Sequence, residues 1–231
     1  MSALGRVRAA VAERGLGTVV ADRLWRLAGA GRRIDLDFNW YRLALADPER
    51  PRRPLPDGLS LRRASAEDLA LLEQLPDDAA ITTFTPGLAA DRRGAGHELW
   101  LVTDGQRVAF ACWIFRGTAE VAGAPGGGAP MPPGTVMLED SITSPDFRGR
   151  GVAPAAWAAI ADALAAEGTE RMYTKVEKVN IPSCKAVEKA GFRTVATMTV
   201  AGRPPRRLAF RVHMQDGHDG GDGWLGALAN G

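Results

Sequence analysis

The sequence predicts a mixed α/β domain that carries an N-terminal extension, and three observations lead to this prediction. Runs of apolar residues with a period of two recur between residues 57 and 213, as in the strands of a partly buried sheet. Two segments among these runs, 154–167 and 181–190, have helical spacing instead. The chain has 231 residues, 45% apolar and 24% charged, which is typical of a soluble domain with a full core.

Residues 1–55 form the predicted extension, which is basic. They carry 11 basic and 6 acidic residues, a net charge of +5, whereas residues 56–231 carry 18 and 21, a net charge of −3. Apolar residues at helical spacing before Gly31 predict two short amphipathic helices. The period of two that follows, over 34–41, predicts a half-buried strand. Prolines 51, 54 and 56 then predict a linker.

The domain at 56–213 is expected to begin with a strand at 59–63 and a helix at 65–75, where Asp68 resembles the acid of a capping box. Residues 77–96 are polar, with weak helical character. Strands at 97–103 and 108–115 are joined by Asp104-Gly105, a dipeptide typical of hairpin turns.

The second half of the domain contains the clearest patterns. The glycine- and proline-rich segment 123–134 predicts a long flexible loop, and the Gly- and Asp-rich segment 214–231 predicts a flexible tail. Between them we expect these elements in order: strand 135–143, helix 154–167, strand 171–176, helix 181–190, and strands 192–200 and 208–213.

Charge and composition exclude several classes of protein. The net charge is +2 and no basic stripe is interleaved with aromatics, so we expect no nucleic-acid partner. Two cysteines cannot form a disulfide framework, and the three histidines do not cluster with them, so we expect no metal. The sequence contains no run of 18 apolar residues that would predict a membrane span. It also shows no signal-peptide pattern at its start, so the expected location is the cytoplasm.

The segment 144–153, SPDFRGRGVA, lies between a predicted strand and a predicted helix. Glycines 149 and 151 would let backbone amides approach a ligand closely, and the helix N-terminus adds free N–H groups and a positive dipole end. Together with Arg148 and Arg150, this turn suits a phosphate. An ordinary strand-to-helix turn remains the alternative. No Gly-Lys-Ser/Thr follows, so the turn is not a P-loop.

Two motifs resemble those of the GNAT acetyltransferase superfamily. The first is Arg148-Gly149-Arg150-Gly151-Val152-Ala153, which fits the pattern Q/R-x-x-G-x-G/A. The second begins at Asn180-Ile181-Pro182-Ser183 and ends with Glu188-Lys189-Ala190-Gly191-Phe192. The resemblance covers roughly residues 57–213.

This resemblance implies the GNAT fold: a mixed, mostly antiparallel sheet in which the parallel strands near 135–143 and 171–176 splay apart. It implies that acetyl-CoA or another acyl-CoA is the co-substrate, with its pantetheine arm between these strands and its pyrophosphate on the amides of the glycine-rich turn. The cofactor contacts that it implies are Ile142, Thr143, Ser144, Arg148, Gly149, Arg150, Gly151, Val152, Ala153, Asn180 and Ser183.

Two adjacent acids, Glu139 and Asp140, are the candidate bases. An alkylamine is mostly protonated at pH 7, so acyl transfer to it needs a proton acceptor. Strand alternation would send the two side chains to opposite faces, and a bulge would change that parity. We favour Glu139 as the base and Asp140 as a group that orients the substrate, while a structural or solvated role stays open for each.

The family's tyrosine on the helix after Asn180 corresponds to Val187 here. Ser183, Cys184 or water would have to protonate the leaving thiolate, or no acid is needed. The leading hypothesis is therefore an N-acetyltransferase acting on a small-molecule or peptide amine. A non-catalytic acyl-CoA-binding module is the alternative. Residues 1–55 are expected to pack on the domain or across a homodimer, or else to dock on a membrane or partner.

Overall fold

The computed structural model describes residues 34–75, 84–121, 128–202, 209–215 and 223–228, so the two predicted N-terminal helices lie outside the described residues. Eight strands form one mixed sheet in the order β10-β9-β1-β8-β7-β4-β3-β2. Their bounds are β1 Ile34–Ala44, β2 Ser60–Arg63, β3 Glu98–Thr103, β4 Val108–Arg116, β7 Thr135–Thr143, β8 Arg171–Glu177, β9 Arg193–Gly202 and β10 Ala209–Met214. Every neighbouring pair is antiparallel except β7 and β8, which are parallel. The predicted fold class is confirmed.

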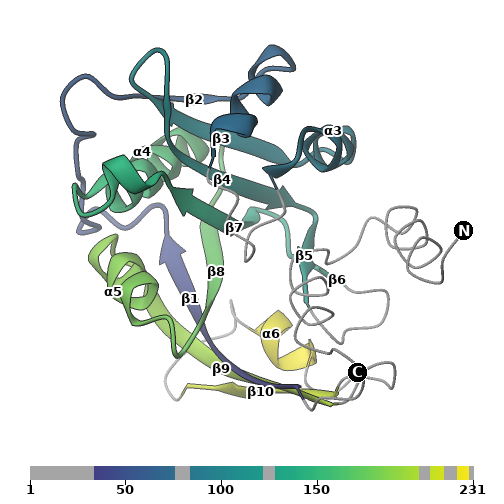
Figure 1. Ribbon diagram of the computed structural model, residues 1–231. Coiled ribbons are helices and arrows are strands. Elements are labelled where there is room, and N and C mark those ends of the chain that lie inside the picture. Colours follow the sequence, from purple (N-terminus) through teal and green to yellow (C-terminus); the bar gives the residue numbers. More distant parts are fainter. Residues whose placement is uncertain (1–33, 76–83, 122–127, 203–208, 216–222, 229–231) are drawn as a thin grey trace, which may run out of the picture.

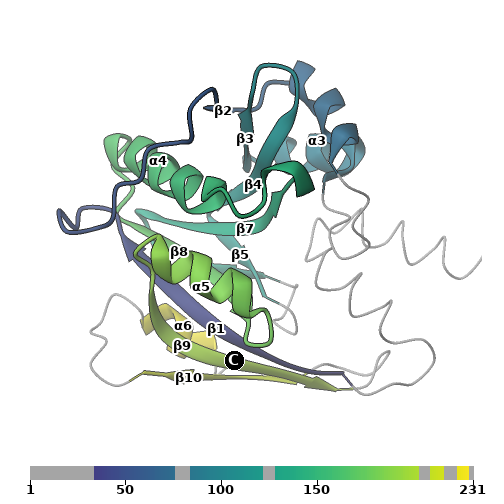
Figure 2. The same cartoon turned by 60° about the vertical axis from the view of Figure 1, so that its left-hand side comes forward.

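Helices cover both faces of this sheet (Figure 1). On one face lie α4 (Val152–Ala166) and α5 (Ile181–Lys189), whose apolar residues join a core with Tyr41 and Phe110. On the other lie α3 (Pro86–Gly94), α6 (Gly223–Leu228) and the 3-10 helix Glu67–Gln74, over a core that includes Trp40 and Trp113. Figure 2 shows α4 beside β7 and α5 beside β8. No helix among the described residues is long and apolar enough to cross a membrane.

Strand β1 occupies a central position that local patterning does not predict. It pairs antiparallel with β8 on one side and with β9 on the other, so it belongs to the sheet although it was expected within the extension. The connection from β1 to β2 is held against the domain by buried Arg50, which forms an ion pair with Asp162 of α4. The sheet therefore begins well before the boundary expected at residue 56.

Most predicted elements lie within two residues of the observed ones, and three differ. Part of the predicted loop 123–134 forms a short strand, β6 (Gly128–Pro130), which pairs with β5 (Thr118–Glu120) in a separate ribbon. Part of the predicted flexible tail forms α6, because Leu225 is fully buried. The helix expected at 65–75 is a 3-10 helix; Asp68 accepts from the Ser65 amide, but no side chain caps the helix.

Candidate functional site

The parallel strands β7 and β8 are paired only at their beginnings. Their register joins Thr135 to Arg171, and it ends where Met137 lies beside Tyr173. Beyond these residues a cavity of about 170 Å³ opens between the two strands, lined from β7 by Glu139, Asp140 and Ser141. The opposite wall comes from β8 and from the start of α5, and β1 and α4 complete the cavity. The splay implied by the resemblance is therefore present.

A bulge in β7 places both candidate acids on one face of the sheet. Trp113 of β4 lies opposite Glu139, whereas Ala111 lies opposite Ile142, so β7 takes three steps where β4 takes two. Asp140 absorbs the extra residue with φ of 51°, in the left-handed region. Simple alternation would have separated Glu139 from Asp140, and the bulge instead turns both toward the face that carries α3 and α6.

Glu139 forms an ion pair with Lys175 of β8 across the opening between the strands. The Lys175 side chain is only 3% exposed and that of Glu139 is 10% exposed, so both groups are largely removed from water. Lys175 also lies over the ring of Trp40, with Nζ 5.8 Å from the ring centroid. Because the pair borders the cavity, a molecule bound there would meet it directly.

Asp140 has a different partner, Arg92 of α3. Nη1 of Arg92 donates to Oδ2 of Asp140 at 2.8 Å, and Nη2 lies 3.4 Å from both carboxylate oxygens of Glu120. The guanidinium is 5% exposed and stacks over the rings of Trp113 and Phe115. Arginine stays protonated in proteins, so the guanidinium provides a permanent positive charge between the Asp140 and Glu120 carboxylates.

These five residues, Glu120, Arg92, Asp140, Glu139 and Lys175, form a charge cluster with three acids and two bases. Desolvation by burial raises the pKa of Glu139 from its ordinary value near 4.5 to about 7. Lys175 acts in the opposite direction, and Asp140 and Glu120 add to the increase. Glu139 can therefore take up and release a proton near neutral pH, which a general base requires.

The glycine-rich turn connects β7 to α4, as expected. Gly149 and Gly151 have φ of 75° and 74°, and a side chain built at either would meet no atom within 4 Å, so this backbone borders open space. Gly151 is the N-cap of α4, and no side chain among the described residues caps the helix. The first amides of α4 are thus available for an anion. Arg148 and Arg150 are exposed beside them.

The remaining predicted cofactor contacts fall into two groups: residues from the end of β7 to the start of α4 that are buried, half-buried or already hydrogen-bonded, and residues of α5 and its N-cap that line the cavity. Ser144 has internal partners for all its polar groups: its amide bonds to Ala109, its hydroxyl to Val108, and its carbonyl accepts from Phe147. The Thr143 carbonyl accepts from Nε of Arg148 at 3.1 Å. The Ile142 side chain is buried in the core. Val152 is buried and Ala153 is half-buried in the first turn of α4.

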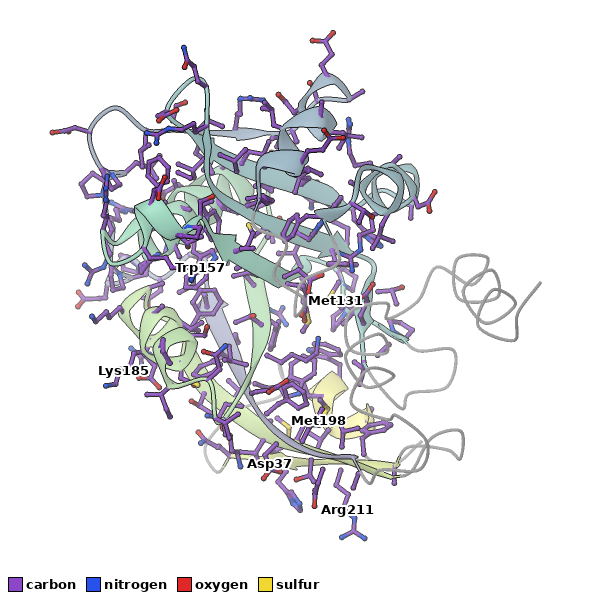
Figure 3. The ribbon with its side chains drawn as sticks, viewed as in Figure 1. Asp37, Met131, Trp157, Lys185, Met198 and Arg211 are labelled. Atoms are coloured by element: carbon purple, nitrogen blue, oxygen red, sulfur yellow. The ribbon has the colours of Figure 1, made fainter. Side chains whose placement is uncertain are left out.

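Asn180 and Ser183 lie together in the cavity wall. The Asn180 side chain caps α5, with Oδ1 accepting from the Ser183 amide at 3.3 Å, and both residues line the cavity. Val187 lies one turn further along α5 and is buried in the cavity wall. From α4, Trp157 points toward β7 and donates from Nε1 to Ser141 at 3.2 Å (Figure 3).

Neither tyrosine of the chain takes the place of the residue missing at Val187. Tyr41 is fully buried and hydrogen-bonds to Asn39 and Glu188, and burial raises its pKa to about 12, which makes it a weaker proton donor. Tyr173 packs edge-on against Trp224 on the opposite face, with ring centroids 5.4 Å apart. Cys184 is buried, with Sγ directed to the Glu177 carbonyl at 3.7 Å.

Sequence reasoning missed Lys175, Arg92 and Glu120. A lysine inside the apolar strand 171–176 was the available signal for the first, because an unpartnered lysine is almost never buried. Arg92 and Glu120 lie in segments with weak patterning, so only the tertiary structure shows that Arg92 contacts Asp140 in the cavity wall and that Glu120 contacts Arg92.

The sequence profile of the acetyltransferase (GNAT) family matches residues 64–192, more than half of the chain. No functionally curated protein matches the sequence. Three solved structures share the fold: a putative GNAT acetyltransferase from Novosphingobium aromaticivorans (18% identity, TM-score 0.51, 81% of this chain and 69% of that one), an acetyltransferase from Colwellia psychrerythraea (12%, 0.51, 80% and 71%), and a GCN5-related N-acetyltransferase from Kribbella flavida (13%, 0.53, 79% and 64%).

The chain spans only 60% of the length of a Drosophila protein of known structure that matches 88% of this chain at 15% identity, with a TM-score of 0.49. The fold and the family profile nevertheless agree over the region that contains the splayed strands, the glycine-rich turn and α5. This chain belongs to the GNAT family of acetyltransferases.

Proposed function

We propose that this chain is an acyl-CoA-dependent N-acyltransferase that moves an acetyl group to a primary amine, with Glu139 as the general base. The observation that carries the proposal is the carboxylate of Glu139 at the wall of the cavity between β7 and β8, in surroundings that raise its pKa to about 7. A base of this pKa is half ionised near neutral pH, where proton transfer is most useful.

The charge cluster also supports an amine as the acceptor. Three carboxylates and two cations leave one excess negative charge when all are ionised, so an incoming ammonium group is electrostatically favoured. Glu139 would take one proton from this ammonium. The freed nitrogen lone pair forms the new C–N bond at the thioester carbonyl. The nitrogen then gives up its second proton to water, the C–S bond breaks, and the leaving sulfur takes up a proton.

The residues present fit an acyl-CoA. The open backbone at Gly149 and Gly151, the uncapped start of α4, and the exposed Arg148 and Arg150 suit its pyrophosphate. The edge of β7 that no longer pairs with β8 beyond Met137 suits an extended pantetheine chain. When bound, the thioester supplies the activated acyl carbon, and Asn180 and Ser183 would contact the cofactor from the α5 side. Ser144 is the least suited of the predicted residues to contact the cofactor, because its polar groups already have partners.

Protonation of the leaving sulfur is assigned to Ser183 or to water. Ser183 lines the cavity and is half-buried, while Val187 offers no donor. A thiol leaves as a stable thiolate near neutral pH, so a weak donor is sufficient. The acceptor is a small-molecule or peptide amine, and the site of action is the cytoplasm. Residues 34–44 belong to the sheet, so docking on a homodimer partner or a membrane is left to residues 1–33.

A second function is favoured by one observation, the apolar Val187 in the cavity wall. A chain that keeps the cofactor site but lacks a proton donor at this position would bind acyl-CoA without turnover. Binding and turnover must therefore be measured on the same preparation.

The test is a panel of primary amines, read by release of the CoA thiol, with the CoA-induced rise in melting temperature measured in parallel. We expect thiol release to fall about 10²–10⁴-fold in Glu139→Gln, with the thermal shift retained. Below pH 7 the wild-type rate should decline, because Glu139 becomes protonated. Glu98→Gln is the matched control: Glu98 is also ion-paired, but with Arg63 and Arg116 outside the cavity.

The outcomes separate the two functions. A thermal shift without thiol release on any amine would favour the binding module. Full activity in Glu139→Gln with a large loss in Asp140→Asn would transfer the role of base to Asp140. Absence of both shift and turnover would overturn the assignment of an acyl-CoA site.

A further inference from the structure

Lys175 is enclosed by elements from three distant parts of the chain. It lies directly opposite Trp40 in the pairing of β8 with β1, and its ammonium lies over the Trp40 ring. Trp40 is fully buried, and Trp224 of α6 packs edge-on against it, with centroids 6.0 Å apart and an interplanar angle of 86°. The Lys175 side chain thus packs against an edge-on pair of tryptophans, and its ammonium forms an ion pair with Glu139 of β7.

The burial of the Lys175 ammonium is not explained by stability alone. Moving a charge out of water is costly even after the protein relaxes, and a buried ion pair often contributes little net stability. An apolar side chain on β8 would fill the space against Trp40 at no such cost. The ion pair also lies in the cavity wall, where the acceptor amine would approach, and not in the closed part of the core.

We propose that Lys175 is a positioning residue for acyl transfer, whose ammonium holds the Glu139 carboxylate at the cavity wall in the ionised form that accepts a proton. This inference rests on the proposed function. Lys175 itself forms no bond with the acyl group; it acts through Glu139.

The charges around Glu139 show what removal of Lys175 would do. Asp140 of β7 and Glu120 of β5 both disfavour the ionised form of Glu139. Arg92 of α3 is engaged with those two acids, and Glu177 of β8 also lines the cavity. Lys175 is the cation that acts directly on Glu139 and lowers its pKa. Without it, burial and the neighbouring acids would raise that pKa further.

The experiment is the pH dependence of kcat from pH 6 to 10 in the full chain, with one acceptor amine for all variants so that its own titration cancels. Lys175→Met is expected to move the rising limb up by at least about one pH unit. For a shift of one unit from a pKa of about 7, this corresponds to about a fivefold loss at pH 7, which approaches tenfold at lower pH and largely disappears at high pH. Lys175→Arg, which keeps the charge, should return the limb toward the wild-type position.

A structural role would give a different result. Uniform loss at every pH with the limb unmoved would overturn the proposal. Lys178→Met is the matched control, since Lys178 is exposed just beyond the end of β8, and it should leave the profile unchanged. If Lys175→Met does not fold, Lys175→Gln and the double variant Glu139→Gln/Lys175→Met replace it. The double variant leaves no lone charge in the cavity wall and should show no rising limb from Glu139.

A second readout separates this inference from the proposed function. The Glu139 carboxyl can be titrated by 13C NMR without substrate, with Glu139→Gln to assign its signal. An unchanged Glu139 titration in Lys175→Met would overturn the role of Lys175 even in an active enzyme. If the Glu139 titration shifts in Lys175→Met but the wild-type protein turns over no amine, the proposed function is overturned, and with it the positioning role.

Discussion

The neighbouring carboxylates of Glu139 and Asp140 lie in one cavity wall but have different ion-pair partners. Asp140 pairs with the Arg92 guanidinium, which also contacts Glu120 and lies over the rings of Trp113 and Phe115. Glu139 faces the ammonium of Lys175, and burial raises the pKa of Glu139 to about 7. The bulge therefore joins Asp140 to α3 and leaves Glu139 beside Lys175 at the opening between the strands, where Glu139 can exchange a proton.

At the residue scale, Asn180 has two roles that can be measured separately. Its side chain caps α5 and also lines the cavity. We expect Asn180→Ala to lower the free energy of unfolding by about 0.5–2 kcal/mol, through loss of the cap. We also expect it to raise the KM for acetyl-CoA about 2–10-fold, the effect of one lost hydrogen bond.

The matched variant for this prediction is Asn180→Ser, which keeps a capping oxygen on a shorter side chain. Its stability should stay close to that of the wild type, while its KM for acetyl-CoA rises as in Asn180→Ala. Thermal unfolding and steady-state kinetics measure the two effects. A wild-type KM in both variants would leave Asn180 as a helix cap alone.

Single residues were predictable where the chemistry is local. The cap at Asn180 and the acids of β7 follow from residue type and position in the sequence. The shared face of Glu139 and Asp140 did not, because a bulge depends on the register between β4 and β7. Lys175 was missed for a similar reason: its partner Glu139 lies 36 residues away, and nothing local indicates that they meet.

At the element scale, the turn before α4 combines two left-handed glycines with an uncapped helix start. Gly151→Val should cost about 1–2 kcal/mol of stability, since a side chain is strained at φ of 74°. A branched Cβ would also stand where a pyrophosphate would approach the amides. We therefore expect the dissociation constant for CoA to rise about tenfold or more, with the thermal shift reduced accordingly.

Gly168, just beyond the other end of α4, provides the control. It has φ of 85°, and a side chain built there would also meet no atom within 4 Å. Gly168→Val should thus show a similar loss of stability with normal CoA binding, measured by calorimetry or thermal shift. Equal loss of CoA binding in both variants would point to strain in α4 and not to a phosphate site.

Elements with strong intrinsic patterns were predicted well. Strand β7 has the predicted bounds, and α4 and α5 differ from prediction by at most two residues at either end. Strand β6 and helix α6 were missed because they are short and rich in glycine or proline. They are stabilised by the partner strand β5 in one case and by burial of Leu225 in the other, and neither is visible in local sequence.

At the scale of the whole molecule, the position of β1 decides which parts of the chain the fold requires. The sequence predicted a strand at this place but assigned it to an extension, because alternation shows that a strand is half-buried without showing which strands it joins. In the structure β1 separates β8 from β9 and contributes Trp40, on which Lys175 lies. The N-terminal part of the chain therefore takes part in building the cavity.

Removal of residues 1–55 should consequently abolish folding. The deletion leaves β8 and β9 without their shared partner and removes Phe38, Trp40, Tyr41 and Leu43, all buried. Each such side chain contributes about 1.5–3 kcal/mol, so together they approach the 5–15 kcal/mol that stabilises a typical domain. We expect no cooperative thermal unfolding by circular dichroism and no CoA-induced shift.

Truncation after Gln215 is the comparison: it removes α6 but keeps all eight strands, and should fold with a melting temperature lower by roughly 5–15 °C. A cooperative, CoA-binding protein lacking residues 1–55 would show that another segment can fill the place of β1, and that neither the sheet nor the setting of Lys175 depends on it.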